Sequence, residues 1–188
     1  DHLSVSFHML KILGKSPSGK RLERIKNSPN YKNGAFQNIE PTEAILKDAS
    51  MPKMLKEIFF NRPANLSPAI DVTAFKIDLT KLSDTKSSIV WFGHSSYYIN
   101  HHGFKILVDP VLSGHASPFS SMVKAFKGAD IYKAEDIPEI DLLLITHDHY
   151  DHLDYKVVLK LKHKFKKVLT ALGVGSHLEY WGIDSNKI

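Results

Sequence analysis

The pattern of apolar and polar positions changes near residue 86. From there on, short apolar runs bounded by polar residues predict strands over residues 89–92, 97–100 and 104–108, with a turn at residues 101–103. Further along, the pattern predicts a buried strand over 141–146, a helix over 155–165, a strand over 168–171 and a short helix over 176–181. Strands and helices in this order indicate an α/β layer arrangement.

The first 85 residues have a different character. Proline and asparagine interrupt them repeatedly, and they contain one clear helical segment at residues 52–60, with Ser50 as its N-cap and Pro52 in its first turn. We therefore expect residues 1–85 to form an extension that wraps the core, and residues 86–188 to contain the core itself.

The chain of 188 residues carries a net charge of +5, with lysines concentrated in residues 11–32 and 156–167. A basic surface would attract anionic lipid or nucleic acid. The second lysine group, however, has the spacing of a solvated helix face whose buried face is Val157, Val158, Leu161 and Phe165, and this interpretation is favoured. No run of 18 apolar residues occurs, so the sequence predicts no membrane span and leaves a bacterial cytoplasm or a cell envelope open as location.

The strongest chemical signal directly follows the apolar run 142–145. His147, His149, Asp151 and His152 form an H-x-H-x-D-H array, and the chain has no cysteine that could offer alternative ligands. Imidazole nitrogens and carboxylate oxygens are ligands that zinc accepts. At the end of a strand, residues i and i+2 point the same way, so His147 and His149 can hold one ion while Asp151 and His152 reach a second. This spacing favours a two-metal site over a solvated polar loop.

The array resembles the signature of metallo-β-lactamase-fold hydrolases. Other segments resemble, in the same order, the branch of that family similar to N-acyl-phosphatidylethanolamine-hydrolysing phospholipase D. These segments are Trp91-Phe92-Gly93-His94-Ser95-Ser96, Val108-Asp109-Pro110, Ala116-Ser117-Pro118, Leu172-Gly173-Val174-Gly175 and Tyr180-Trp181-Gly182. The resemblance implies a metallo-β-lactamase-like αββα sandwich of two halves. Residues 86–188 would be the N-terminal half, and the ligands expected from the second half have no counterpart here.

The resemblance also implies roles for single residues. His147 and His149 would hold one zinc ion and Asp151 and His152 the other, with Asp151, His152 and Asp109 as the catalytic set. Asp109 would accept a hydrogen bond from a ligating histidine, although an aspartate before a proline is also an ordinary turn residue. In the family, the positions of His94 and His115 lie near the substrate cleft. For His94, a satisfied core histidine is an equally good interpretation.

The resemblance therefore implies a zinc-dependent phosphodiesterase with two ions per complete site. It would act on N-acyl phosphatidylethanolamine or a related lipid through a metal-bridging hydroxide. A lactonase or a nuclease on the same fold is one alternative, and a non-catalytic half-domain for metal binding or assembly is another. The expected partners are a phospholipid or other phosphodiester, a membrane surface contacted peripherally, and either the missing C-terminal half or a second copy. Nucleic acid is not expected.

Overall fold

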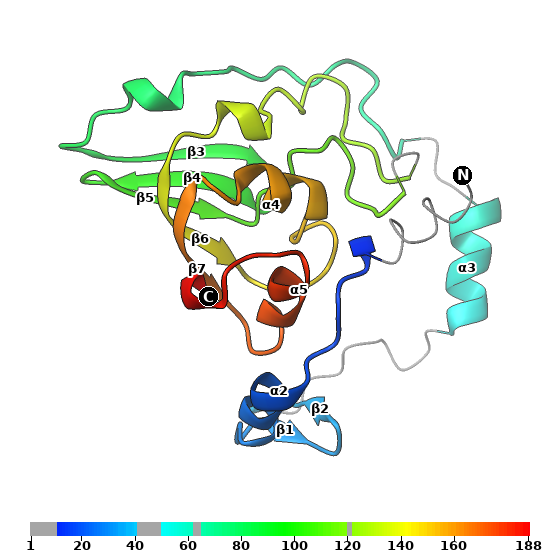
Figure 1. Cartoon of the computed structure of the whole chain (residues 1–188). Coiled ribbons are helices and arrows are strands. Elements are labelled where there is room, and N and C mark those ends of the chain that lie inside the picture. The colour runs from blue at the N-terminus through cyan, green and yellow to red at the C-terminus, as the bar shows by residue number, and fades with distance from the viewer. Residues whose placement is uncertain (1–10, 41–49, 62–64, 120–121) are drawn as a thin grey trace, which may run out of the picture.

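A mixed five-stranded sheet organises the chain. The computed structural model describes residues 11–40, 50–61, 65–119 and 122–188 (Figure 1). The sheet runs β3 (Ser87–Gly93), β4 (Ser96–His101), β5 (Phe104–Val108), β6 (Ile140–Ile145) and β7 (Phe165–Thr170) in chain order. The first three strands are antiparallel, whereas β5, β6 and β7 are parallel. The predicted α/β class is confirmed.

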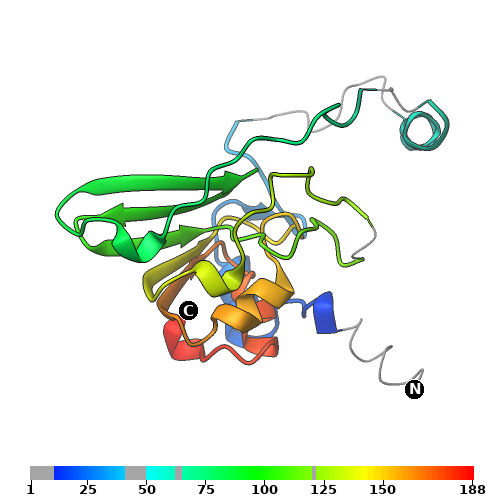
Figure 2. The same cartoon turned by 90° about the horizontal axis from the view of Figure 1, so that it is seen from above.

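One face of this sheet is the core. Tyr98, Leu107, Leu143 and Val168 are paired across β4, β5, β6 and β7 and are buried. Two elements lie over them on one side of the sheet, α4 (Tyr155–Leu161) and the 3₁₀ turn η2 (Ala134–Asp136) (Figure 2). The helix α5 (Gly175–Tyr180) adds Leu178 to the same apolar cluster. Side chains alternate along a strand, so the neighbouring positions must point to the opposite face.

That opposite face is apolar and largely uncovered. In register, Ile89 pairs with Ile99, Ile99 with Ile106 and Ile106 with Leu142. The edge residues Ile89, Trp91 and Leu169 are 70%, 69% and 57% exposed, and the central residues are half-buried. Monomeric proteins rarely leave so continuous an apolar surface open. This face has the pattern expected for an inner layer of a sandwich.

The predicted helix 155–165 was too long. Helix α4 ends at Leu161, residues 162–164 form a turn, and Phe165 begins β7, where it pairs with Ile140 and is buried. Pairing in the sheet therefore overrides the helical spacing of this apolar residue. As a consequence Lys166 and Lys167 lie on a strand rather than on a solvated helix face, and Lys166 Nζ lies 2.6 Å from Asp141 Oδ1.

Within residues 1–85, the structure shows elements that the hydrophobic pattern did not predict. These are α2 (Gly19–Lys26), a small hairpin of β1 (Tyr31–Lys32) and β2 (Ala35–Phe36), and the 3₁₀ turn η1 (Leu79–Lys81); a further turn, η3 (Ser185–Lys187), ends the chain. The predicted helix is present as α3 (Met51–Phe60), and Ser50 Oγ accepts from Lys53 N at 3.4 Å as its cap. The described side chains of α3 are exposed. No helix among the described residues is both long and apolar enough to cross a membrane.

The segment before α2 is anchored on α5. The indole of Trp181 donates to the carbonyl of Lys11 at 2.8 Å, the backbone N–H of Lys15 donates to His177 Nδ1 at 3.0 Å, and Arg21 pairs with Glu179 at 2.8 Å. Gly14 permits this close approach, because its φ is +73° and a Cβ there would overlap the His177 ring. The N-terminal segment therefore docks through backbone atoms of Lys11 and Lys15 and through one side-chain ion pair from α2.

The substitution Gly14→Ala should detach this segment. Gly19 is the matched control, since its φ is +52° and an added Cβ would meet nothing within 4 Å. Both alanine variants carry the backbone cost of a left-handed residue, about 1 kcal/mol, but only Gly14→Ala also forces His177 away. Thermal unfolding and limited proteolysis should show a larger loss for Gly14→Ala, with cleavage near Lys15. Equal losses for both variants would contradict the docking described here.

Candidate metal centre

The candidate site lies where three chain segments meet at the carboxyl ends of strands. His94 is in the turn between β3 and β4, Asp109 directly follows β5, and the segment 146–152 follows β6. Since β5 and β6 are parallel neighbours, their carboxyl ends emerge at the same edge, which is where α/β sheets place ligands. Topology thus brings together residues up to 58 positions apart.

Asp109 is the most constrained residue of the site. Its side chain is 1% exposed, and its carboxylate accepts from Thr146 N at 2.8 Å, Thr146 Oγ1 at 2.6 Å and His152 Nδ1 at 2.8 Å. Its carbonyl accepts from Ser96 Oγ at 2.5 Å, and its N–H donates to Leu144 O at 3.0 Å. A buried carboxylate needs such donors, and these also fix the neighbouring groups. The predicted contact between Asp109 and a histidine of the array is present.

The proton positions on two imidazoles follow from this network. A carboxylate only accepts, so Nδ1 of His152 donates to Asp109, and in the neutral imidazole the lone pair is then on Nε2. The Thr146 hydroxyl donates to Asp109 and therefore accepts from His147 Nδ1 at 3.0 Å, which leaves Nε2 of His147 free. The rings of His147 and His152 lie 3.9 Å apart and those of His147 and His149 4.7 Å apart. The structure thus gathers the three histidines of the array.

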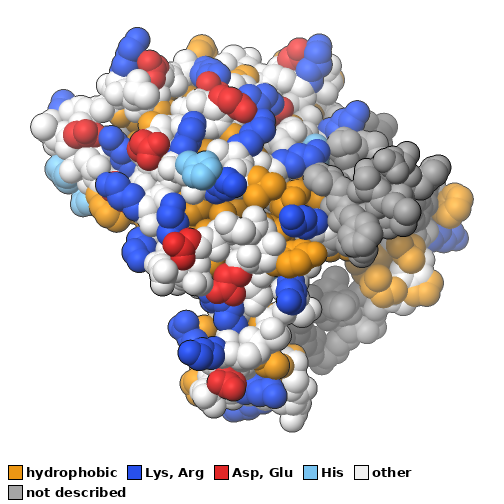
Figure 3. All heavy atoms as spheres, viewed as in Figure 1, with side chains coloured by type: hydrophobic (Ala, Val, Ile, Leu, Met, Phe, Trp, Pro, Cys, Tyr) orange, Lys and Arg blue, Asp and Glu red, His pale blue; other side chains and the backbone are white. Residues whose placement is uncertain are grey.

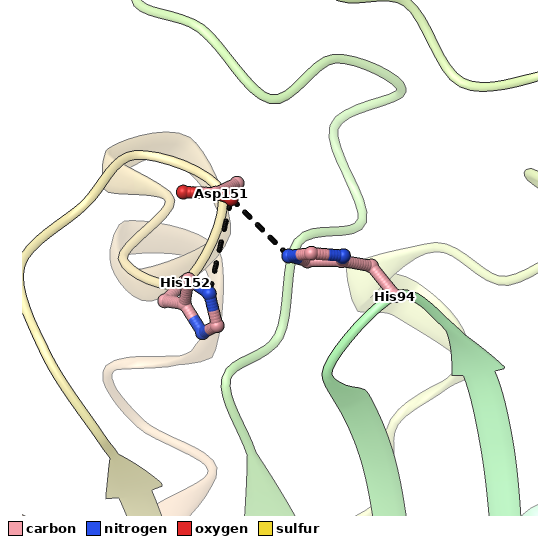
Figure 4. Close-up of side chains that lie close together, drawn as sticks. All are labelled: His94, Asp151 and His152. Atoms are coloured by element: carbon pink, nitrogen blue, oxygen red, sulfur yellow. Dashed lines mark hydrogen bonds and ion pairs between the residues drawn. The ribbon is translucent and has the colours of Figure 1, made fainter. Parts of the chain in front are cut away.

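His94, in the turn between β3 and β4, lies next to Asp151 of the segment that follows β6. Its Nε2 lies 3.1 Å from Asp151 Oδ2, and Asp151 Oδ2 is 3.8 Å from His152 Nε2 (Figure 4). The ligating atoms of these three residues all lie within 4.8 Å of one another. His94 is 59% exposed at its side chain, so it is not a satisfied core histidine.

Two of these residues have unusual backbone conformations. His94 has φ +45° and Asp109 has φ +40°. Non-glycine residues in the left-handed region cost of order 1–3 kcal/mol, and such strain clusters at functional sites. The Trp91 indole donates to the His94 carbonyl at 2.9 Å and holds the turn in place.

A partly open cavity of about 740 Å³ lies beside His94 and Asp151. Its walls are mainly apolar and include Trp91, Phe92, Val111, Leu112, Phe126 and Tyr132. His115, the other predicted substrate contact, also lines it, but it is buried and Nδ1 donates to the carbonyl of Ser117 at 2.7 Å. The volume is in the range of ligand sites.

Asp154 secures the end of the metal-binding segment. It is fully buried and caps α4, accepting from Lys156 N at 3.0 Å and Val157 N at 3.2 Å. It also accepts from Ser113 N at 3.2 Å and so ties the segment to the cavity wall. Burial raises the pKa of the Asp154 carboxyl, and these hydrogen bonds oppose the shift. Tyr150 packs against the core, where burial raises its pKa.

Sequence reasoning missed Thr146 and the cavity. Thr146 precedes the array and has no motif of its own, although a hydroxyl next to a metal ligand is a usable signal. The cavity depends on Val72 and residues 123–130, which come from segments without strong periodicity. Their position follows only from tertiary contacts such as the hydrogen bond from Val72 N to Lys127 O at 2.8 Å.

The residues fit divalent metal ions. In the part of the chain that the structure describes, the donor atoms of His94, Asp151 and His152 form a group in which all lie within 4.8 Å of one another. His147 and His149 are not part of such a group, although the ring of His147 lies 3.9 Å from that of His152. Nitrogen and oxygen donors of this kind suit zinc, and nitrogen-rich carboxylate sets also suit iron. Asp109 supplies the outer carboxylate that such histidine ligands commonly have.

Comparison with known proteins agrees with this geometry. The β-lactamase superfamily domain matches residues 88–180. An uncharacterised protein of Mycobacterium tuberculosis is 30% identical over 87% of this chain and 44% of its own length. N-acyl-phosphatidylethanolamine-hydrolyzing phospholipase D 1 of Caenorhabditis elegans is 38% identical over 38% of this chain and 20% of its own length. A UPF0173 metal-dependent hydrolase of Anaeromyxobacter is 29% identical over 52% of this chain and 32% of its own length.

The chain spans less than half the length of these curated relatives. Residues 88–180 nevertheless contain the five-stranded sheet except Ser87, together with the H-x-H-x-D-H array, Asp109 and His94. One of the relatives is described as a metal-dependent hydrolase, which agrees with a site for a divalent metal in this chain. Through residues 88–180, this chain belongs to the β-lactamase superfamily and has its metallo-β-lactamase-like α/β fold.

Proposed function

We propose that this chain provides metal-binding and substrate-binding residues of a zinc-dependent phosphodiesterase that acts on N-acyl phosphatidylethanolamine or a related lipid. The observation that carries the proposal is the position of the apolar cavity, which opens directly onto His94 and Asp151. An acyl chain would bury its methylene groups there at a gain of about 0.8 kcal/mol for each. The bond to be cleaved would then lie beside the metal-binding residues.

His147 and His149 would hold one ion, and Asp151 and His152 the other. Bound metal ions supply Lewis acidity, which activates water and stabilises charge on the phosphoryl oxygens. The chain's own part is to fix these ligands in place. Asp109 orients His152 through Nδ1, and Thr146 orients His147, so both imidazoles present Nε2 to the site.

The alternatives on the same fold receive less support. A nuclease needs a basic channel, but several lysines near the core are already engaged: Lys160 with Glu135, Lys166 with Asp141, and Lys164 with the Ile137 carbonyl. Acidic side chains are interspersed among the more numerous basic ones on the face that carries α4, so this face is no continuous basic channel (Figure 3). A lactonase shares the metal chemistry, and a non-catalytic half-domain shares the ligands, so both become outcomes of the tests below.

Peripheral membrane contact is part of the proposal. The loop beside the cavity mouth exposes large apolar side chains together with Lys124. These apolar residues are Phe119, Met122, Val123 and Phe126. An exposed apolar loop with a basic residue suits the interface of an anionic bilayer.

The substitution Asp109→Asn should weaken metal binding selectively. It removes the charge that faces His152 and places an amide N–H₂ against the donors of Thr146, so we expect zinc affinity to fall by roughly 10–100-fold. Asp141→Asn is the matched control, because Asp141 also accepts from a backbone N–H, Lys105 N at 2.8 Å, and pairs with a lysine, yet it lies at the other end of β6. Competitive zinc titration would measure both. An equal fall in zinc affinity in both variants would contradict a role of Asp109 in the metal centre.

The cavity predicts an effect of Phe126→Asp on apolar substrates. Phe126 lines the cavity and is 49% exposed, whereas Phe119 is 50% exposed on the same loop and does not line it. With a monomeric, water-soluble acyl phosphodiester, Phe126→Asp should lower kcat/KM by roughly 10–100-fold and Phe119→Asp should not. On anionic vesicles both variants should lose activity. The assay uses the natural gene product loaded with zinc.

His147→Ala serves as the reference for lost catalysis in this assay and should abolish hydrolysis. Activity on a lactone or an oligonucleotide that exceeds activity on the acyl phosphodiester would favour the corresponding alternative. Unchanged hydrolysis in His147→Ala would contradict an enzymatic role for this site.

A further inference from the structure

We propose that His94 is a third ligand of the metal ion held by Asp151 and His152. The inference rests on the proposed metal centre and adds a residue from outside the H-x-H-x-D-H array. His94 comes from the turn between β3 and β4, 53 residues before His147.

The distances agree with a shared ion. In a tetrahedral zinc site with bonds of about 2.0–2.1 Å, neighbouring ligand atoms are separated by roughly 3.4 Å. His94 Nε2 is 3.1 Å from Asp151 Oδ2, and His152 Nε2 is 3.8 Å from the same oxygen. Figure 4 shows His94, from the turn between β3 and β4, and His152 both in contact with Asp151, which lies in the segment after β6.

The chemistry of each donor also agrees. His152 gives its Nδ1 proton to Asp109, so its Nε2 lone pair faces the group. Nε2 of His94 now donates to Asp151. On metal binding this proton would leave for solvent or for Nδ1 of the same ring, and the freed lone pair would bind the ion. One bond to hydrogen is exchanged for one bond to metal, and no redox partner is needed.

The backbone of the turn points to the same role. His94 stands at φ +45°, where a hairpin turn ordinarily prefers glycine or asparagine. The Trp91 indole donates to its carbonyl and holds this conformation, although Trp91 itself is largely exposed. The positive φ alone does not mark a ligand, because the exposed turn residue His102 has φ +51° as well. The hydrogen bond from Trp91 fixes the position of the His94 backbone, as a metal ligand requires.

The two metal positions therefore differ. The ion at Asp151 would have three ligands from this chain, and the ion at His147 and His149 would have two. We expect the chain to bind its first equivalent of zinc at His94, Asp151 and His152, and its second more weakly.

The test is a zinc titration of the full chain with ¹⁵N-labelled histidine, followed through the ring nitrogens by NMR. The first equivalent should move Nε2 of His94 and His152 to metal-bound positions. Variants His94→Asn and His102→Asn then supply a matched pair. His102 also has a positive φ, +51°, is exposed, and lies at the opposite end of β4, and asparagine tolerates the left-handed region in both places.

Loss of a direct ligand should weaken the first zinc in His94→Asn by at least about 100-fold, beyond the usual effect of an outer-shell partner, and leave His102→Asn at the wild-type affinity. If zinc moves the resonances of His152 but leaves His94 Nε2 protonated, His94 is no ligand and the metal centre stands without it. If no histidine of the site responds, the metal centre itself is wrong.

Discussion

The site depends on the buried carboxylate of Asp109. It accepts three hydrogen bonds from residues that follow β6, while its own backbone belongs to the end of β5. Because the group is 1% exposed, each missing donor would leave a buried charge poorly compensated, at a cost of about 1–3 kcal/mol or more. This requirement fixes the segment 146–152 against the sheet and sets the proton positions on His152 and His147. The geometry of the metal ligands thus follows from satisfying one internal charge.

The sheet explains the position of His94, which we propose as a further ligand. β4 lies between β3 and β5, and Ser96 at its start donates to the Asp109 carbonyl and accepts from Val111 N. The turn that carries His94 is therefore tied to the same residue that orients His152. His94 and Asp151 also line the cavity, so the cavity and the candidate metal centre lie at the same edge of the sheet. The sheet face opposite the core exposes the apolar residues Ile89, Trp91 and Leu169 and so has the composition of an interior surface.

Local patterns in the sequence predicted much of this arrangement. The strands from Ser87 to Val108 follow period-two alternation, and the array after β6 follows ligand chemistry at i and i+2. The end of α4 was missed because the apolar Phe165 fits both a helix and a strand, and only pairing with Ile140 decides between them. The approach of His94 to Asp151 could not be read from spacing, since it depends on a turn conformation and on the order of strands. Lys11 and Lys15 make their contacts through backbone atoms, so the identity of their side chains could not predict these contacts.

The central claim is that residues of this chain bind divalent metal. The most direct measurement is elemental analysis of the purified chain after dialysis, beside the double variant Asp151→Asn with His152→Ala. The structure predicts at least one zinc or other divalent ion per chain, lost in the double variant. A metal content no higher than that of the double variant would contradict the account.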